Sequence, residues 1–138
     1  MSSSYYLVSN NPRIRTLPRC IYVEGSILDV LVAARDKVHV GYKILSHPLS
    51  GNIAPSMRIF MTIILAQSPC EGHFTDIESL NVIESTLEFC KDQSLSSIKL
   101  DQKVLEDMQY LDEQLIMPVL CRYGIVSKQE VCLIDRGK

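Results

Sequence analysis

The sequence feature that most constrains the fold is a set of short, apolar, β-prone segments in the first half of the chain, each bounded by turn residues. These segments are residues 5–9, 20–23, 42–46 and 59–65. Apolar runs of this length, ended by Asn, Gly, Pro or Ser, are typical of buried strands. The sequence therefore predicts four strands before residue 67.

Helical patterns occur between and after these segments. Ser26 precedes apolar residues at three- and four-residue spacing, and Asp29 lies where a capping box needs an acid, so we expect a helix from Ser26 to Gly41. Residues 75–90 begin with a second capping pattern and form a second amphipathic helix. A third carries Val104, Met108, Leu111 and Leu115 on one stripe, and we expect Pro118 to end or kink it.

Strands that alternate with helices indicate an α/β fold with right-handed crossovers. We expect one domain over residues 1–138, with a strand-rich half at 1–67 and a mainly helical half at 68–138. The expected sheet is four-stranded and mostly parallel, flanked by helices, with a Rossmann-like topology. Residues 131–134 would add a fifth strand. The short link between the third and fourth strands leaves room for one antiparallel pair.

Composition excludes several classes of protein. The 138 residues include 14 Lys and Arg against 16 Asp and Glu, and 46% are hydrophobic. This balance argues against disorder and against a basic nucleic-acid-binding surface. The longest apolar run is too short for a membrane helix, and no signal-peptide pattern precedes it, so we expect a cytoplasmic protein without a membrane partner. Five scattered cysteines without a CxxC pair predict reduced thiols and no compact zinc site. Because the sequence has no nucleotide-binding or metal-binding motif, we also expect no metal and no cofactor.

The strongest functional signal lies in the turns at the ends of the predicted strands. In open α/β sheets, ligands bind beyond the carboxyl ends of the strands. Polar and glycine-containing turns stand at these positions, and their residues are Asn10, Asn11, Glu24, Ser26, His47, Ser50 and Gly51. A helix N-terminus at Ser26 and backbone N–H groups around Ser50 and Gly51 favour an anion. We predict that these residues bind a small polar or anionic ligand at one edge of the sheet.

Other interpretations of the same residues stay open. An Asn-Asn-Pro or His-Pro-Leu-Ser-Gly segment also forms ordinary turns. An enzyme is an alternative, with His47 as general acid or base assisted by Glu24. No nucleotide-binding, hydrolase-elbow or zinc motif supports catalysis, however, so a non-enzymatic role is favoured. A second alternative is a structural adaptor whose apolar helices form a homodimer or a partner surface.

Several segments of the first half resemble one known family. Residues 9–12 read SNNP, residues 23–26 read VEGS, and residues 41–51 read GYKILSHPLSG. Together these resemble the GrdX family, small proteins encoded with the glycine reductase genes of amino-acid-fermenting anaerobes. The resemblance implies an accessory role around that reductase, which converts glycine to acetyl phosphate, with a reductase component or a small metabolite as partner. It does not imply a catalytic subunit.

The sequence departs from the family pattern after Gly51. The family continues with a polar stretch of the Lys-Pro-Asn-Glu type, whereas residues 54–57 here are Ala, Pro, Ser and Met. Where that stretch contributes to a site in the family, this chain lacks part of it.

Overall fold

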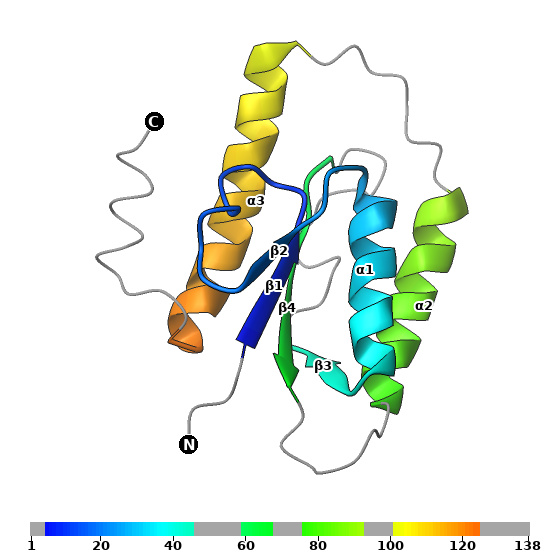
Figure 1. Ribbon diagram of the computed structural model, residues 1–138. Helices are drawn as coiled ribbons and strands as arrows, with labels where there is room; N and C mark the ends of the chain where they lie inside the picture. The colour runs from blue at the N-terminus through cyan, green and yellow to red at the C-terminus, as the bar shows by residue number, and fades with distance from the viewer. Residues whose placement is uncertain (1–4, 46–58, 68–75, 93–100, 125–138) are drawn as a thin grey trace.

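The computed structural model describes residues 5–45, 59–67, 76–92 and 101–124, which form an α/β arrangement of four strands and three helices (Figure 1). Their order along the chain is β1 (Tyr5–Ser9), β2 (Cys20–Tyr22), α1 (Ile27–His39), β3 (Tyr42–Ile44), β4 (Thr62–Gln67), α2 (Ile77–Asp92) and α3 (Gln102–Arg122). The four predicted strands and three predicted helices are therefore confirmed. The fifth strand expected at residues 131–134 lies outside the described residues.

The sheet is mixed, with the strand order β2-β1-β4-β3. Only β1 and β2 are parallel, whereas β4 is antiparallel to β1 and to β3. The expectation of a mostly parallel sheet is thus wrong, and the Rossmann-like topology is not supported. The reason is the position and direction of β4: it lies between β1 and β3 and is antiparallel to both of them.

Three of the strands nevertheless point the same way. β4 is antiparallel to both of its neighbours, so β1 and β3 share one direction, and β2 is parallel to β1. The carboxyl ends of β1, β2 and β3 therefore face one edge of the sheet, where the amino end of β4 also lies. We call this the carboxyl edge. It is the edge at which the sequence predicts a ligand.

Helices cover both faces of the sheet, with α1 and α2 on one side and α3 on the other (Figure 1). Neighbouring residues of each strand supply the two cores, because side chains alternate across a sheet. Val8 packs with the α1 and α2 side chains, whereas Leu7 packs against Ile116 and Leu120 of α3. Full burial of each such side chain is worth about 1.5 to 3 kcal/mol. Both cores hold the carboxyl edge in place.

The α2 N-terminus is fixed to the sheet through a cap. Asp76 accepts hydrogen bonds from the backbone N–H and the hydroxyl of Ser79, and the Ser79 hydroxyl oxygen accepts the backbone N–H of Ile44 in β3. Asp76 thus stands at the N-cap position predicted one residue earlier, at Thr75, which lies outside the described residues. The bond from the Ser79 hydroxyl, with smaller help from Lys43, lowers the pKa of Asp76 below its ordinary value of 3.8.

Asp76→Ala is expected to lower the free energy of unfolding by about 1 kcal/mol at pH 7, the usual contribution of an N-cap. Asp76→Asn keeps an acceptor but not the charge, so it is the matched control. Because folding lowers this pKa, the charge-dependent part of the stabilisation is present above pH 3.8 and is lost as the pH falls through the lower folded value. Urea unfolding should therefore show the difference between wild type and Asp76→Asn shrinking below pH 4. A difference that grows with acid would contradict the assignment.

Helix α3 departs most from the predicted pattern. It continues through Pro118 to Arg122, and Leu111, placed by the sequence on the apolar stripe, is 39% exposed. Asp112 and Glu113 are buried instead, at 2% and 0% exposure. Helix α3 therefore packs two buried carboxylates against the sheet. The hydrogen-bond and ion-pair partners of these carboxylates define the candidate site.

Candidate functional site

A buried row of hydroxyl groups connects the carboxyl end of β1 to helix α3. The Ser9 hydroxyl lies 2.8 Å from the Thr62 hydroxyl, which donates to Asp112 Oδ2 over 2.7 Å. Since Thr62 has one hydroxyl proton and gives it to Asp112, Ser9 is the donor in the first bond. The backbone N–H of Asn11 completes the row by donating to the Ser9 hydroxyl oxygen at 3.0 Å. The row joins β1, β4 and α3 through polar contacts that solvent does not reach.

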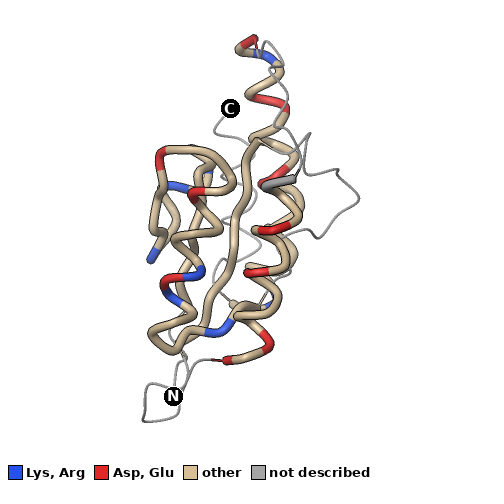
Figure 2. The backbone as a smooth tube through the Cα atoms, turned by 90° about the vertical axis from the view of Figure 1, so that its right-hand side faces the viewer, with Lys and Arg blue, Asp and Glu red and all other residues tan. Residues whose placement is uncertain are grey.

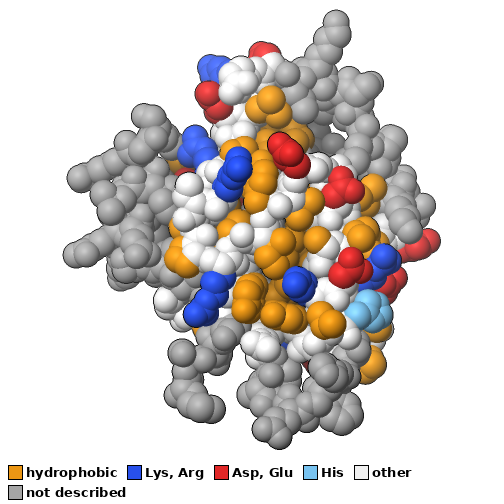
Figure 3. Space-filling view, viewed as in Figure 1, with side chains coloured by type: hydrophobic (Ala, Val, Ile, Leu, Met, Phe, Trp, Pro, Cys, Tyr) orange, Lys and Arg blue, Asp and Glu red, His pale blue; other side chains and the backbone are white. Residues whose placement is uncertain are grey.

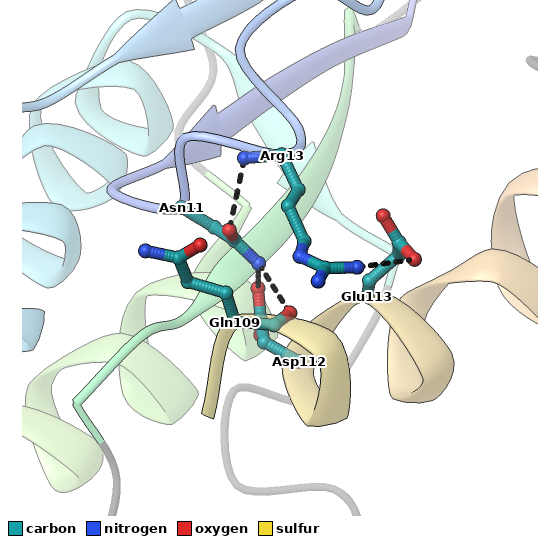
Figure 4. Close-up of polar contacts among 5 residues, drawn as sticks. All are labelled: Asn11, Arg13, Gln109, Asp112 and Glu113. Atoms are coloured by element: carbon teal, nitrogen blue, oxygen red, sulfur yellow. Dashed lines mark hydrogen bonds and ion pairs between the residues drawn. The ribbon is translucent and has the colours of Figure 1, made fainter. Parts of the chain in front are cut away.

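Asn11 ties the turn after β1 to the same helix (Figure 4). Its Nδ2 donates to the backbone carbonyl of Gln109 at 2.9 Å and to Asp112 Oδ2 at 3.0 Å. Its Oδ1 accepts the backbone N–H of Arg13, which is the local Asx turn expected of this residue type. Asp112 Oδ2 therefore receives two donors, from Asn11 and from Thr62.

Arg13 is held in a defined position beside this row. Its Nη1 lies 3.5 Å from Oε1 of Glu113 (Figure 4). Its guanidinium carbon lies 5.5 Å from the centre of the Tyr110 ring. The Glu113 side chain is 0% exposed, whereas that of Arg13 is 21% exposed. The result is a cation anchored from the inside by a buried carboxylate, with part of its surface open to solvent.

Asn10 connects the turn after β1 to other parts of the sheet, as Asn11 connects it to α3. Its Nδ2 donates to the backbone carbonyls of Gly25 and Ile59, and its Oδ1 accepts the backbone N–H of Met61. One amide thus brings together the turn after β1, the turn after β2 and the approach to β4. The expected meeting of the first two turns at the carboxyl edge is present in this contact.

The predicted site residues fall into three groups. Asn10 and Asn11 are buried, and both N–H groups of each side chain donate to other groups of the protein. Glu24 is exposed, and Ser26 directs its backbone N–H and hydroxyl to Asp29 in the predicted capping box. The remaining three, His47, Ser50 and Gly51, lie outside the described residues. The ligand-binding assignment and the pairing of His47 with Glu24 both stay predictions.

Glycine at position 25 is explained by the same capping box. A Cβ atom there would collide with the Asp29 carboxylate, which reaches back over the turn to cap α1. The turn between β2 and α1 therefore depends on a glycine for space, and this gives the Val-Glu-Gly-Ser segment a structural reason beside any functional one.

Sequence analysis missed Arg13 as an anchored cation and missed both buried carboxylates. A signal was present: Asp112, Ile116 and Leu120 follow one another at four-residue spacing, which places them on one helix face. Periodicity based on apolar residues alone selected the neighbouring stripe. Buried carboxylates are retained in proteins when they are paired and hydrogen-bonded. Asp112 accepts hydrogen bonds from Asn11 and Thr62, and Glu113 pairs with Arg13 through Oε1.

The described part of the chain offers hydrogen-bonding and ion-pair chemistry. It contains no group of three or more His, Cys, Asp or Glu side chains arranged to hold a metal ion. Among the same residues, no helix has the length and apolarity needed to cross a membrane. Among the described residues of the first two turns at the carboxyl edge, Arg13 is partly exposed and Glu24 is exposed, whereas Asn10 and Asn11 are buried.

Comparison with protein families agrees with the resemblance of the first half and extends it. The model of the GrdX-like protein family matches residues 6–121. The chain belongs to the GrdX-like protein family. This GrdX-like match runs from β1 almost to the end of α3, so it includes the turn that carries Arg13 as well as Asp112 and Glu113. No curated protein and no solved structure matches the chain.

Proposed function

We propose that this GrdX-like protein is an accessory protein of the glycine reductase system and binds a small anionic ligand at the carboxyl edge, with Arg13 as the anion-binding residue. The observation that carries the proposal is the anchoring of Arg13: a fully buried Glu113 holds the guanidinium of a side chain that is still 21% exposed. Family membership supports the accessory role, and the geometry of Arg13 supports the class of ligand.

A guanidinium suits a carboxylate or phosphate because its planar fork offers parallel N–H donors. Glu113 engages Nη1, and the ring of Tyr110 lies against the guanidinium. Holding the side chain in place before binding reduces the entropy that a ligand must otherwise offset. The neighbouring turns supply further polar groups, including the exposed Glu24, which disfavours a second negative charge on the ligand at that side.

The proposal is tested by thermal unfolding with four anions or zwitterions: glycine, acetate, acetyl phosphate and inorganic phosphate. A ligand at 100 times its dissociation constant stabilises the native state by about 2.7 kcal/mol, which corresponds to a rise in Tm of roughly 9 °C for a chain of this length. Arg13→Lys keeps the positive charge beside Glu113 but removes the fork. We expect it to weaken binding at least tenfold, as measured by calorimetric titration.

Arg15→Lys is the matched control, because Arg15 is exposed two residues further on and lies over Tyr22, away from Glu113. It should bind as wild type does. A His47→Ala, Ser50→Ala double variant tests whether the predicted loop residues take part. The site assignment is wrong if none of the four compounds raises Tm, or if Arg13→Lys and Arg15→Lys bind equally well.

A further inference from the structure

Within the described part of the chain, strand β2 has one hydrogen-bonded neighbour, and no described strand pairs with its other side. It stands at the end of the strand order and pairs with β1 alone among the described strands. The Arg19 carbonyl accepts the N–H of Leu7, and the N–H of Val23 donates to the Ser9 carbonyl, so residues 19, 21 and 23 face β1. The backbone N–H and C=O groups of Cys20 and Tyr22 therefore point to the outer side, as a further strand would require.

The side chains of β2 provide an apolar surface next to these groups. Cys20, Ile21 and Tyr22 are all half-buried. Burial raises the pKa of the Cys20 thiol to about 11, so this side chain is neutral at physiological pH. In the space-filling view, hydrophobic side chains gather along the middle of the face turned to the viewer, with Lys, Arg, Asp and Glu side chains among and around them (Figure 3). Edge strands of this kind are usually protected by charge or by a bulge.

The charged side chains of the segment that leads into this strand have one sign. Residues 14–23 contain two arginines, Arg15 and Arg19, and no acidic residue, in a chain whose net charge is -2. Arg15 and Arg19 are exposed, and the Arg15 guanidinium carbon lies 5.0 Å from the centre of the Tyr22 ring. The first acid, Glu24, comes after the strand has ended. A positive surface thus borders the open side of β2.

We infer that the outer side of β2 binds an extended, acidic segment of a partner protein as an added strand. Main-chain hydrogen bonds to an exposed sheet edge supply affinity in this mode of recognition, and side-chain contacts supply specificity. Here the apolar residues of β2 would accept alternate side chains of the segment, and Arg15 and Arg19 would pair with its acids. This inference does not use Arg13 or the anion site.

A second copy of the chain would pair less well with the outer side of β2. Pairing through the same strand would bring Arg15 and Arg19 of the second copy, with only Glu24 as an acid, to the interface, so like charges would dominate. The acidic residues that recur along α2, Glu78, Glu84 and Glu88, belong to a helix and cannot extend the sheet (Figure 2). A nucleic acid would use the arginines but not the backbone groups of Cys20 and Tyr22. An acidic strand uses both.

Fluorescence anisotropy with a labelled seven-residue peptide in which Glu and Val alternate tests the inference. We expect saturable binding of the peptide to the protein. We expect the affinity to be at least tenfold lower in an Arg15→Glu, Arg19→Glu variant. Lys103→Glu, Arg122→Glu is the matched control: it makes the same change in charge at two positions of α3 and should bind as wild type does. A peptide N-methylated at alternate residues keeps the charge but loses strand donors, and should bind at least tenfold more weakly.

Four results would overturn the inference. In the first two, a peptide with Lys in place of Glu, or the N-methylated peptide, binds as tightly as the Glu-Val peptide. In the third, a ten-residue oligothymidylate binds more tightly than the Glu-Val peptide. In the fourth, the protein self-associates through β2. The last is read from light scattering: a dimer that dissociates in the Arg15→Glu, Arg19→Glu variant would identify a second copy as the occupant. Because Arg13 is unchanged throughout, anion binding measured on the same variant separates failure here from failure of the proposed function.

Discussion

Replacing Asp112 by alanine is expected to lower the free energy of unfolding by about 3 kcal/mol, because two buried donors lose their acceptor together. These donors are the Thr62 hydroxyl and the Asn11 side-chain amide, at 2.7 and 3.0 Å from Asp112 Oδ2. Neither can reach bulk water, since both residues are buried. A loss of this size is a large part of the roughly 5 to 15 kcal/mol that usually separates native from unfolded domains.

Asp107→Ala is the control for this measurement. Asp107 lies on the same helix and is exposed, so removing its carboxylate should change the stability by about 0.5 kcal/mol or less. Urea unfolding followed by circular dichroism at pH 7 compares the two. If Asp112→Ala were no more destabilising than Asp107→Ala, the buried row from Ser9 to Asp112 would not hold α3 against the sheet.

Local signals in the sequence were sufficient for the individual elements. Ser26 with Asp29 marks a helix start by chemistry that acts within one turn. The cap of α2 was predicted at Thr75 and is found one residue later, at Asp76. The strand order could not be obtained this way, because it depends on which strand β4 inserts beside. That choice is made by side chains distant in sequence, such as Thr62 against Ser9. Propensity and periodicity carry no information on such pairs.

In the candidate site too, local features were predictable from the sequence and contacts between distant residues were not. The carboxyl edge was predictable because polar turns come after Ser9 and Tyr22, and Asn10 does join the first turn to Gly25. Asp112 and Glu113 were not predictable from hydropathy, since a buried carboxylate looks like a solvent-exposed one in a sequence. Their burial makes sense only once Asn11 and Arg13, about a hundred residues away, are placed beside them.

The ion pair between Arg13 and Glu113 should make the second large contribution to the free energy of unfolding. Arg13→Met is expected to lower the free energy of unfolding by about 2 to 3 kcal/mol, because it leaves the fully buried Glu113 carboxylate without this cation. The expected loss is below that of a fully buried pair, since Arg13 is 21% exposed and the two atoms are 3.5 Å apart. Arg15→Met, which removes an exposed arginine, should cost no more than about 0.5 kcal/mol.

The double variant Arg13→Met, Glu113→Leu separates the ion pair from packing. If the cost of Arg13→Met comes from an uncompensated buried charge, removing that charge as well should recover most of the lost stability, as replacement of buried ion pairs by apolar residues often does. The coupling measured by urea unfolding of the four proteins should then be at least about 1 kcal/mol. Additive losses would mean that Glu113 does not depend on Arg13. In that case the guanidinium would not be anchored from the interior, and its use as a positioned anion-binding group would lose its physical basis.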